Sequence, residues 1–134
     1  MLKRDYIMVL IEELGKAIAQ MVLNRNSGND GRNPELVRKV YHSLKVEPEF
    51  LLTATPEELR LYLNQDDGCG LVRMELAAKT LIEEGFITSG TVSAPAPVLR
   101  QRAKELLEYI QQNDTTFSLE RVALLEGLKK DQEI

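Results

Sequence analysis

The sequence predicts an all-α fold in which five to six helices form one compact domain spanning residues 1–134. Two observations carry this prediction. Apolar residues recur at steps of three and four through several long segments, which is the period of a helix. No segment alternates apolar and polar residues over the length of a strand. Aromatic residues make up only 5% of the chain and Trp is absent, so we expect an aliphatic core.

The first predicted helix covers residues 4–24, and its apolar surface is wider than one face. The expected inner stripe steps by four and three: Ile7, Ile11, Leu14, Ile18 and Met21. The other apolar residues are Leu10, Ala17 and Val22, which widen the stripe, and Met8 and Val9, which lie on the far side. A helix that is apolar nearly all round is central in its fold or shared with a second chain. Gly15 costs about 1 kcal/mol relative to Ala and leaves room for a close neighbour.

Proline and capping residues mark the starts of the next elements. Residues 24–33 are rich in Asn and Gly and predict a loop. Asn33 is the expected N-cap of a second helix that has Pro34 as its first residue and ends near Leu44. A short helical turn is expected over residues 48–52. Thr55 and Pro56, with two Glu residues after them, repeat the cap–Pro–acid pattern before a helix over residues 56–65.

Three further helical segments complete the chain. A polar loop at residues 64–70 precedes a helix over residues 71–84, which Gly85 is expected to end. Residues 88–97 are rich in Ala, Pro, Ser and Thr without periodicity, and they predict a loop inside the single domain. A helix over residues 98–113 follows. Phe117 and Ser118 then resemble a hydrophobic staple residue and an N-cap before a last helix over residues 119–130.

The charge and cysteine content exclude several classes of protein. The net charge is −4 and shows no basic surplus, so we expect no nucleic acid as a partner. The densest basic group, Arg100, Arg102 and Lys104, has acidic neighbours and is interpreted as part of a solvated helix face. The single cysteine, Cys69, allows no intrachain disulfide and fits a reducing compartment. The apolar runs are too short for a secretory signal or a membrane span, so we expect a cytoplasmic protein without membrane association.

Two resemblances bear on the fold. The residues Asp5-Tyr6-Ile7-Met8 and Ile11-Glu12-Glu13-Leu14-Gly15-Lys16 resemble the start of a family of small uncharacterised bacterial helical proteins, whose first helix reads DYIM-x-x-IE-x-LG. The resemblance extends more loosely to residues 76–85 and 116–121. It implies a helical fold but transfers no catalytic residue, since the family carries no assigned activity. The later helices are similar in outline to tetratricopeptide helix pairs, which implies helical-hairpin packing without a true repeat.

Candidate catalytic and metal-binding residues are few. His42 is the only histidine, and Cys69, between two glycines, is the only cysteine, so a nucleophilic Cys–His pair would have to be assembled by the fold. Asn24, Asn26, Gly28 and Glu35 faintly resemble a calcium loop, but a ligand position holds Gly28 and the position that requires Gly holds Asn29. The acidic turn Asp66-Asp67-Gly68 has no further ligand spacing. We therefore expect no metal, no cofactor and no catalytic residue.

These observations favour a protein–protein interaction or scaffold module. The candidate interaction surface is the apolar run of the first helix: Ile7, Met8, Val9, Leu10 and Ile11. The expected partner is another protein, with a second copy of this chain in a homodimer as one option. On this view a charge at position 9 yields a folded monomer, whereas a charge at Ile11 on the inner stripe damages folding. The alternative class is a small-ligand binder or an enzyme with a site between helices, near His42 or Cys69.

Overall fold

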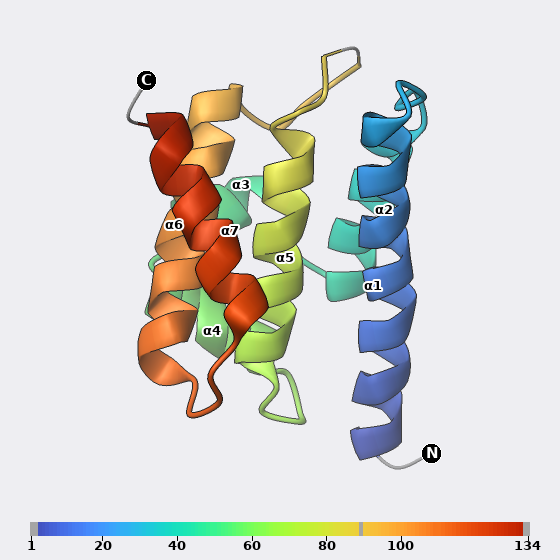
Figure 1. Ribbon diagram of the computed structural model, residues 1–134. Helices are drawn as coiled ribbons and strands as arrows, with labels where there is room; N and C mark the ends of the chain where they lie inside the picture. Colours follow the sequence, from blue (N-terminus) through green and yellow to red (C-terminus); the bar gives the residue numbers. More distant parts are fainter. Residues whose placement is uncertain (1–2, 89, 133–134) are drawn as a thin grey trace.

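The computed structural model describes residues 3–88 and 90–132, and this part of the chain forms seven helices and no strand (Figure 1). In chain order they are α1 (Lys3–Asn26), α2 (Asn33–Leu44), α3 (Pro48–Thr53), α4 (Pro56–Asn64), α5 (Gly70–Glu84), α6 (Ala96–Asn113) and α7 (Leu119–Gln132). The all-α prediction is confirmed, but the expected number of helices is too low. The segment starting at Pro48 is a helix of its own, because Ala54 and Thr55 are extended and separate it from α4.

The helix α5 is the centre of the arrangement. It packs against α1, α2, α4 and α6, and α6 in turn packs against α7. Figure 1 shows α1 and α2 on one side of α5, and α4, α6 and α7 on the other. Residues around most of the circumference of α5 are buried, including Met74, Ala77 and Leu81 at 0% exposure. A helix that has neighbours on several sides needs apolar residues nearly all round. In contrast, α1 lies at an edge of the molecule in this view.

The buried side of α1 differs from the stripe that the sequence suggests. Its core positions step by three and four: Ile7, Leu10, Leu14, Ala17 and Met21. Ile18 is buried beside them, but Ile11, which we expected on the inner stripe, is 39% exposed. The prediction for Ile11 is therefore wrong. A second set of small or apolar residues with the same steps starts at Met8, so the periodicity of α1 alone does not choose which set faces α5 and α2.

Two helix starts are capped as the sequence indicates. Thr55 Oγ1 accepts a hydrogen bond from the Glu58 amide at 3.1 Å, and Glu58 Oε1 accepts one from the Thr55 amide at 3.3 Å. Ser118 Oγ accepts from the Arg121 amide at 3.2 Å, which confirms Ser118 as the N-cap of α7. Phe117 is 69% exposed, so the predicted staple packing of this ring is wrong. Side-chain caps satisfy amides that lack a partner in the first turn of a helix.

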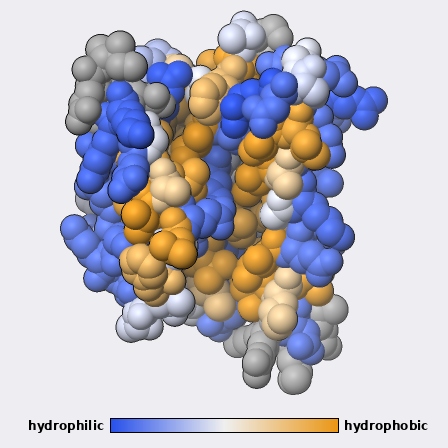
Figure 2. Space-filling view, in the orientation of Figure 1, coloured by the Kyte–Doolittle hydropathy of each residue, from blue (hydrophilic) through white to orange (hydrophobic). Residues whose placement is uncertain are grey.

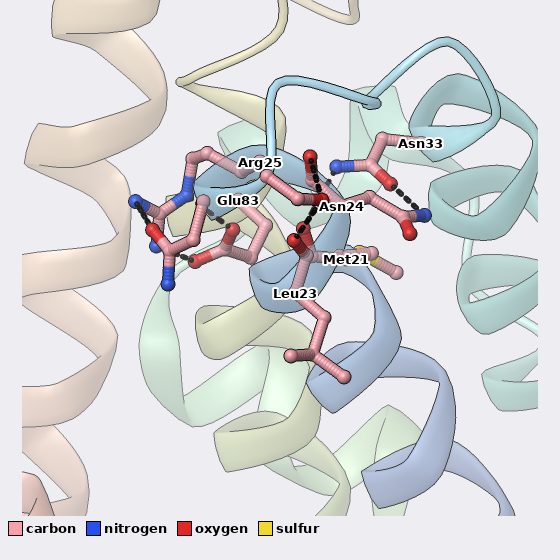
Figure 3. A network of polar contacts seen from close by, with 8 residues as sticks. Met21, Leu23, Asn24, Arg25, Asn33 and Glu83 are labelled. Atoms are coloured by element: carbon pink, nitrogen blue, oxygen red, sulfur yellow. Dashed lines mark hydrogen bonds and ion pairs between the residues drawn. The ribbon is translucent and has the colours of Figure 1, made fainter.

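The Asn33 side chain forms hydrogen bonds with the last turns of α1 instead of capping α2. The N-cap position of α2 is occupied by Arg32, and Asn33 is the first helical residue. The Asn33 side chain is 2% exposed; its Nδ2 donates to the Met21 carbonyl at 3.0 Å, and its Oδ1 accepts from Asn24 Nδ2 at 3.0 Å. Figure 3 shows this amide at the end of α1. The predicted N-cap is wrong because the side chain instead satisfies a buried carbonyl twelve residues earlier.

Arg102 belongs to the interior and not to a solvated face. Its side chain is 7% exposed, Nε donates to the Leu51 carbonyl at 2.8 Å, and Nη2 donates to the Ala54 carbonyl. Both acceptors lie at the end of α3, so Arg102 attaches this short helix to α6. Our interpretation of Arg102 as part of an exposed basic group is therefore wrong. Arg102 lies three residues after Leu99 and four before Leu106, on the apolar stripe of α6.

Two more buried arginines stabilise the loops that precede α5 and α7. Arg73 is 1% exposed, and its two terminal nitrogens lie 2.7 and 2.6 Å from the two carboxylate oxygens of Asp67. Arg121 is 3% exposed and donates to three side chains from three segments: Glu75, Gln111 and Asp114. A buried guanidinium needs several acceptors to offset its desolvation. The acceptors that these two guanidinium groups contact therefore come from the chain itself, and the contacts stabilise the loops before α5 and α7.

Candidate protein-binding groove

The structure divides the predicted interaction surface between the core and the exterior. Ile7 and Leu10 are each 7% exposed and belong to the core. Met8 is 60%, Val9 42% and Ile11 39% exposed. The consecutive run of five apolar residues is thus not one surface, because neighbouring residues on a helix point about 100° apart. Of this run, only Met8, Val9 and Ile11 can contact another molecule.

An apolar groove lies further along α1, and Ile11 is one helical turn before Gly15, the first residue that lines it. Its volume is about 480 Å³, and its walls come from three helices: Gly15, Ile18, Ala19 and Val22 of α1, Leu76 and Lys79 of α5, and Glu120 of α7. Figure 2 shows a hydrophobic band along α1, a second one beside the start of α7, and a hollow between them. We call Met8, Ile11, Gly15, Ala19 and Val22 the outer α1 face; all five are exposed or half-buried and lie on one side of the helix.

Gly15 leaves the middle of the outer α1 face open. Apart from the adjacent residues and the backbone of its own helix, a Cβ atom built on Gly15 would have no heavy atom within 4 Å. The close neighbour that the sequence suggests for Gly15 is therefore not supplied by any part of the chain that the structure describes. Since Gly weakens a helix relative to Ala, its place in the middle of α1 has no explanation in the packing of this chain on itself.

The polar groups at the groove form neutral pairs. Lys79 Nζ lies 2.9 Å from Glu120 Oε1 across the gap between α5 and α7. On α1, Lys16 Nζ lies 3.3 Å from Glu12 Oε1, and these two side chains are 75% and 70% exposed. An apolar floor with polar groups at its edge is the arrangement typical of protein interaction sites. The charged groups that line the groove, Lys79 and Glu120, neutralise each other, and neither is held beside a nucleophile that it could activate.

The structure does not bring His42 and Cys69 into one site. His42 is exposed near the end of α2. Cys69 is half-buried and lines a separate cavity of about 230 Å³, together with Arg60, Glu75 and Asp114 among others, and His42 is not among the lining residues. Burial, followed by the negative charge of Asp67, raises the pKa of the Cys69 thiol. The thiol is thus protonated at neutral pH and has no activating imidazole in its cavity.

Asn24 and Asp67, which belong to the two loops weighed above as metal sites, bond with other side chains of the same chain. The Asn24 side chain bonds with Gln20 and Asn33, and the Asp67 carboxylate is paired with Arg73. Within residues 3–88 and 90–132, no group of three or more His, Cys, Asp or Glu residues is placed to hold a metal ion. The acidic turn therefore acts as an anchor for the start of α5.

Another cavity, of about 210 Å³, lies where the loop after α5 meets α2. It is lined by residues that include Arg38, Tyr41, Glu84 and Ser93. Glu84 is 2% exposed, and both of its oxygens accept: from the Tyr41 hydroxyl at 2.7 Å and from the Ser93 amide at 2.5 Å. Burial and the nearby Glu84 charge raise the pKa of Tyr41 well above its usual value. Tyr41 therefore stays a hydrogen-bond donor, and the carboxylate holds the loop in place.

The wall of the groove that comes from α5 and α7 could not be predicted from the sequence. Leu76, Lys79 and Glu120 have no local pattern that marks them as a site, and only the packing of α5 beside α1 brings them to Gly15. Gly15, a glycine inside a helix, is the one sequence feature that indicates this groove.

None of the helices in the described part of the chain is both long and apolar enough to cross a bilayer. Comparison of the chain with protein-family models, with curated proteins and with solved structures found no match.

Proposed function

We propose that this protein is a protein–protein interaction module that binds an amphipathic helix along the outer α1 face and the adjoining groove. The observation that carries the proposal is that one side of α1 stays exposed or half-buried from Met8 to Val22. Exposed Met8 and Ile11 lead into a groove with an apolar floor, and the centre at Gly15 is free of side chains. Exposed apolar surface of this kind is costly to leave in water unless a partner covers it.

The length and shape of this surface suit a helix. Met8 and Val22 are fourteen residues apart, which corresponds to about 21 Å, or roughly four helical turns. Helices pack with axes about 8–10 Å apart, and small residues at the contact allow the closer distances. Gly15 and Ala19 are such residues, in the middle of the outer α1 face. A helix with apolar residues at steps of three and four would therefore fit between α1 and the start of α7.

The alternative, a small-ligand or enzymatic site, has less support. The cavity beside Glu84 contains a buried carboxylate, but both of its oxygens already accept hydrogen bonds from the chain. We also propose that successive helices pack as tetratricopeptide-like hairpins, since α1 contacts α2 and α5 contacts α6. That arrangement would present the outer α1 face as one wall of a binding groove.

Site-specific photo-crosslinking tests the proposal. A benzophenone amino acid is placed at Leu23, which is next to Val22 and 62% exposed, and at Leu61 on α4, which is 72% exposed and serves as the matched control. We expect irradiation in native cells to give a discrete protein adduct from position 23 only. The adduct should disappear when Gly15→Leu fills the groove. Equal labelling from positions 23 and 61, or an adduct that survives Gly15→Leu, would contradict the proposal.

A further inference from the structure

We propose that the helix bound by the outer α1 face is α1 of a second copy of this chain, antiparallel to the first and crossing it at Gly15. This inference rests on the proposed function and names the partner for the same surface. Three features of α1 support it: the symmetry of the outer face, the position of Gly15 and the placement of the charges beside it.

The outer α1 face is symmetric about its centre. Starting from Met8, its residues follow at steps of three, four, four and three, so Gly15 is the midpoint. In an antiparallel pair centred on Gly15, Met8 lies opposite Val22 of the second copy, and Ile11 lies opposite Ala19. A larger side chain thus meets a smaller one at each of these positions. A two-fold interface requires such self-complementarity, because the same surface is used on both sides.

Gly15 occurs where two antiparallel helices would approach most closely. It lies near the middle of α1, which covers Lys3–Asn26, and no heavy atom outside the adjacent residues and the backbone of this helix comes within 4 Å of a Cβ built there, among the described residues. A glycine at a helix crossing allows the two backbones to approach, whereas a larger residue would separate them. A second α1 therefore provides the close neighbour that this chain does not provide for itself.

The charges beside the outer α1 face favour the antiparallel arrangement. Glu12 and Lys16 are 70% and 75% exposed, and they lie on opposite sides of Gly15 along the helix. With Gly15 at the crossing, the second copy's Lys16 lies about 3 Å along the axis from Glu12, from the rise of 1.5 Å per residue. The same pair forms a second time by symmetry. A parallel arrangement would place Glu12 beside Glu12, with like charges in contact.

Charge-reversed variants give a test specific to this pairing. Glu12→Lys and Lys16→Glu each place like charges across the interface twice, so each variant alone should dissociate about tenfold more readily than the unmodified chain. An equimolar mixture should restore association, because the heterodimer sets two positive side chains of one variant opposite two negative side chains of the other. Sedimentation velocity at several concentrations measures the dissociation constants. Glu126→Lys on α7, also exposed, is the control and should leave association unchanged.

A second variant separates the backbone contact from the charges. Gly15→Leu fills the crossing point, so we expect at least a tenfold weaker dimer from a chain whose circular dichroism stays helical, since open space surrounds the site. High salt should reduce the effect of Glu12→Lys and leave that of Gly15→Leu, because only the former is screened.

The outcomes distinguish this inference from the proposed function. A monomer at all concentrations, or a dimer that neither Glu12→Lys nor Gly15→Leu weakens, overturns the second copy as partner. The proposed function then still stands if the probe at position 23 captures a different protein and Gly15→Leu blocks the capture. If the probe captures nothing, the proposed function is itself wrong. Both proposals are supported if the charge-reversed variants dissociate alone and associate when mixed, and if the probe at position 23 of one copy forms a crosslink to the second copy.

Discussion

Gly70, at the first position of α5, is the residue where the absence of a side chain matters most. A Cβ atom there would overlap the Arg60 carbonyl oxygen and Asn64 Oδ1. The Gly70 amide also donates to Asn64 Oδ1 at 2.9 Å. The end of α4 and the start of α5 can therefore approach this closely only through glycine.

Gly70→Ala should lower the free energy of unfolding by about 2 kcal/mol, the typical cost of overpacking. The backbone carbonyl of Arg60 cannot move aside without disturbing α4. The matched control is Gly127→Ala in α7, where a Cβ meets nothing within 4 Å. That change should instead stabilise by up to about 1 kcal/mol, because Ala favours a helix interior. Urea unfolding of both variants measures the difference, and equal effects would contradict the assignment of Gly70.

A substitution of Arg102 tests how much a buried arginine contributes to the stability of the fold. Arg102→Met keeps an unbranched, flexible stem but removes the guanidinium group, which leaves the Leu51 and Ala54 carbonyls without their donor. Each buried acceptor without a partner costs about 1–3 kcal/mol, so a loss of roughly 3 kcal/mol is expected. Arg38→Met, at an exposed arginine of α2, should change stability by less than about 0.5 kcal/mol. Thermal unfolding of the two variants compares them, and similar melting temperatures would refute the interior role of Arg102.

At the scale of elements, the turn between α4 and α5 depends on an ion pair. The Arg73 guanidinium, held against both oxygens of Asp67, keeps the pKa of this carboxyl well below its usual range. The bidentate geometry and the low exposure of Arg73, at 1%, make the pair sensitive to loss of the charge on Asp67.

This pair predicts the direction of a pH effect. The folded state holds Asp67 ionised, whereas the unfolded chain titrates near the ordinary Asp pKa of about 3.9. The stability from this pair is therefore complete above about pH 4 and decreases as the pH falls below it. A ¹³C NMR titration of the Asp67 carboxyl should give a midpoint clearly below the ordinary value. A midpoint at or above that value would show that the ion pair does not form in solution.

At the scale of the whole molecule, α1 differs from α5 in having neighbours on only part of its circumference. Ile7, Leu10 and Leu14 face α5 and α2, while the outer α1 face borders a groove. The fold is therefore complete without covering all the apolar surface of α1. This leftover surface is the physical basis for the proposed interaction.

Two neighbouring substitutions separate the core side of α1 from its outer face. Leu10→Glu places an unpaired charge in the core and should cost several kcal/mol, or prevent folding. Ile11→Glu, at a position that is 39% exposed, should leave the monomer folded with a change of about 1 kcal/mol or less. Circular dichroism melts test the pair. If Ile11→Glu unfolds the protein and Leu10→Glu does not, the opposite side of α1 faces the core.

The sequence by itself determined the helical class and most helix limits of this protein. These depend on interactions within a few residues, such as the caps at Thr55 and Ser118 and the Pro and Gly residues between segments. It also identified α1 as a helix with more apolar surface than one face can bury. Local signals of this kind act before any tertiary contact exists, and they can therefore be recognised in the chain alone.

Only the tertiary structure decided which side of α1 is buried and where the groove lies. Small or apolar residues recur at steps of three and four on two sides of α1, and the difference between Leu10 and Ile11 follows from the positions of α2 and α5. Likewise, Arg102 and Asn33 carry polar groups that the sequence suggests for solvent or a cap, yet each satisfies carbonyls from another helix. The physical reason is the same throughout: these energies depend on partners distant in sequence, which periodicity and capping rules do not describe.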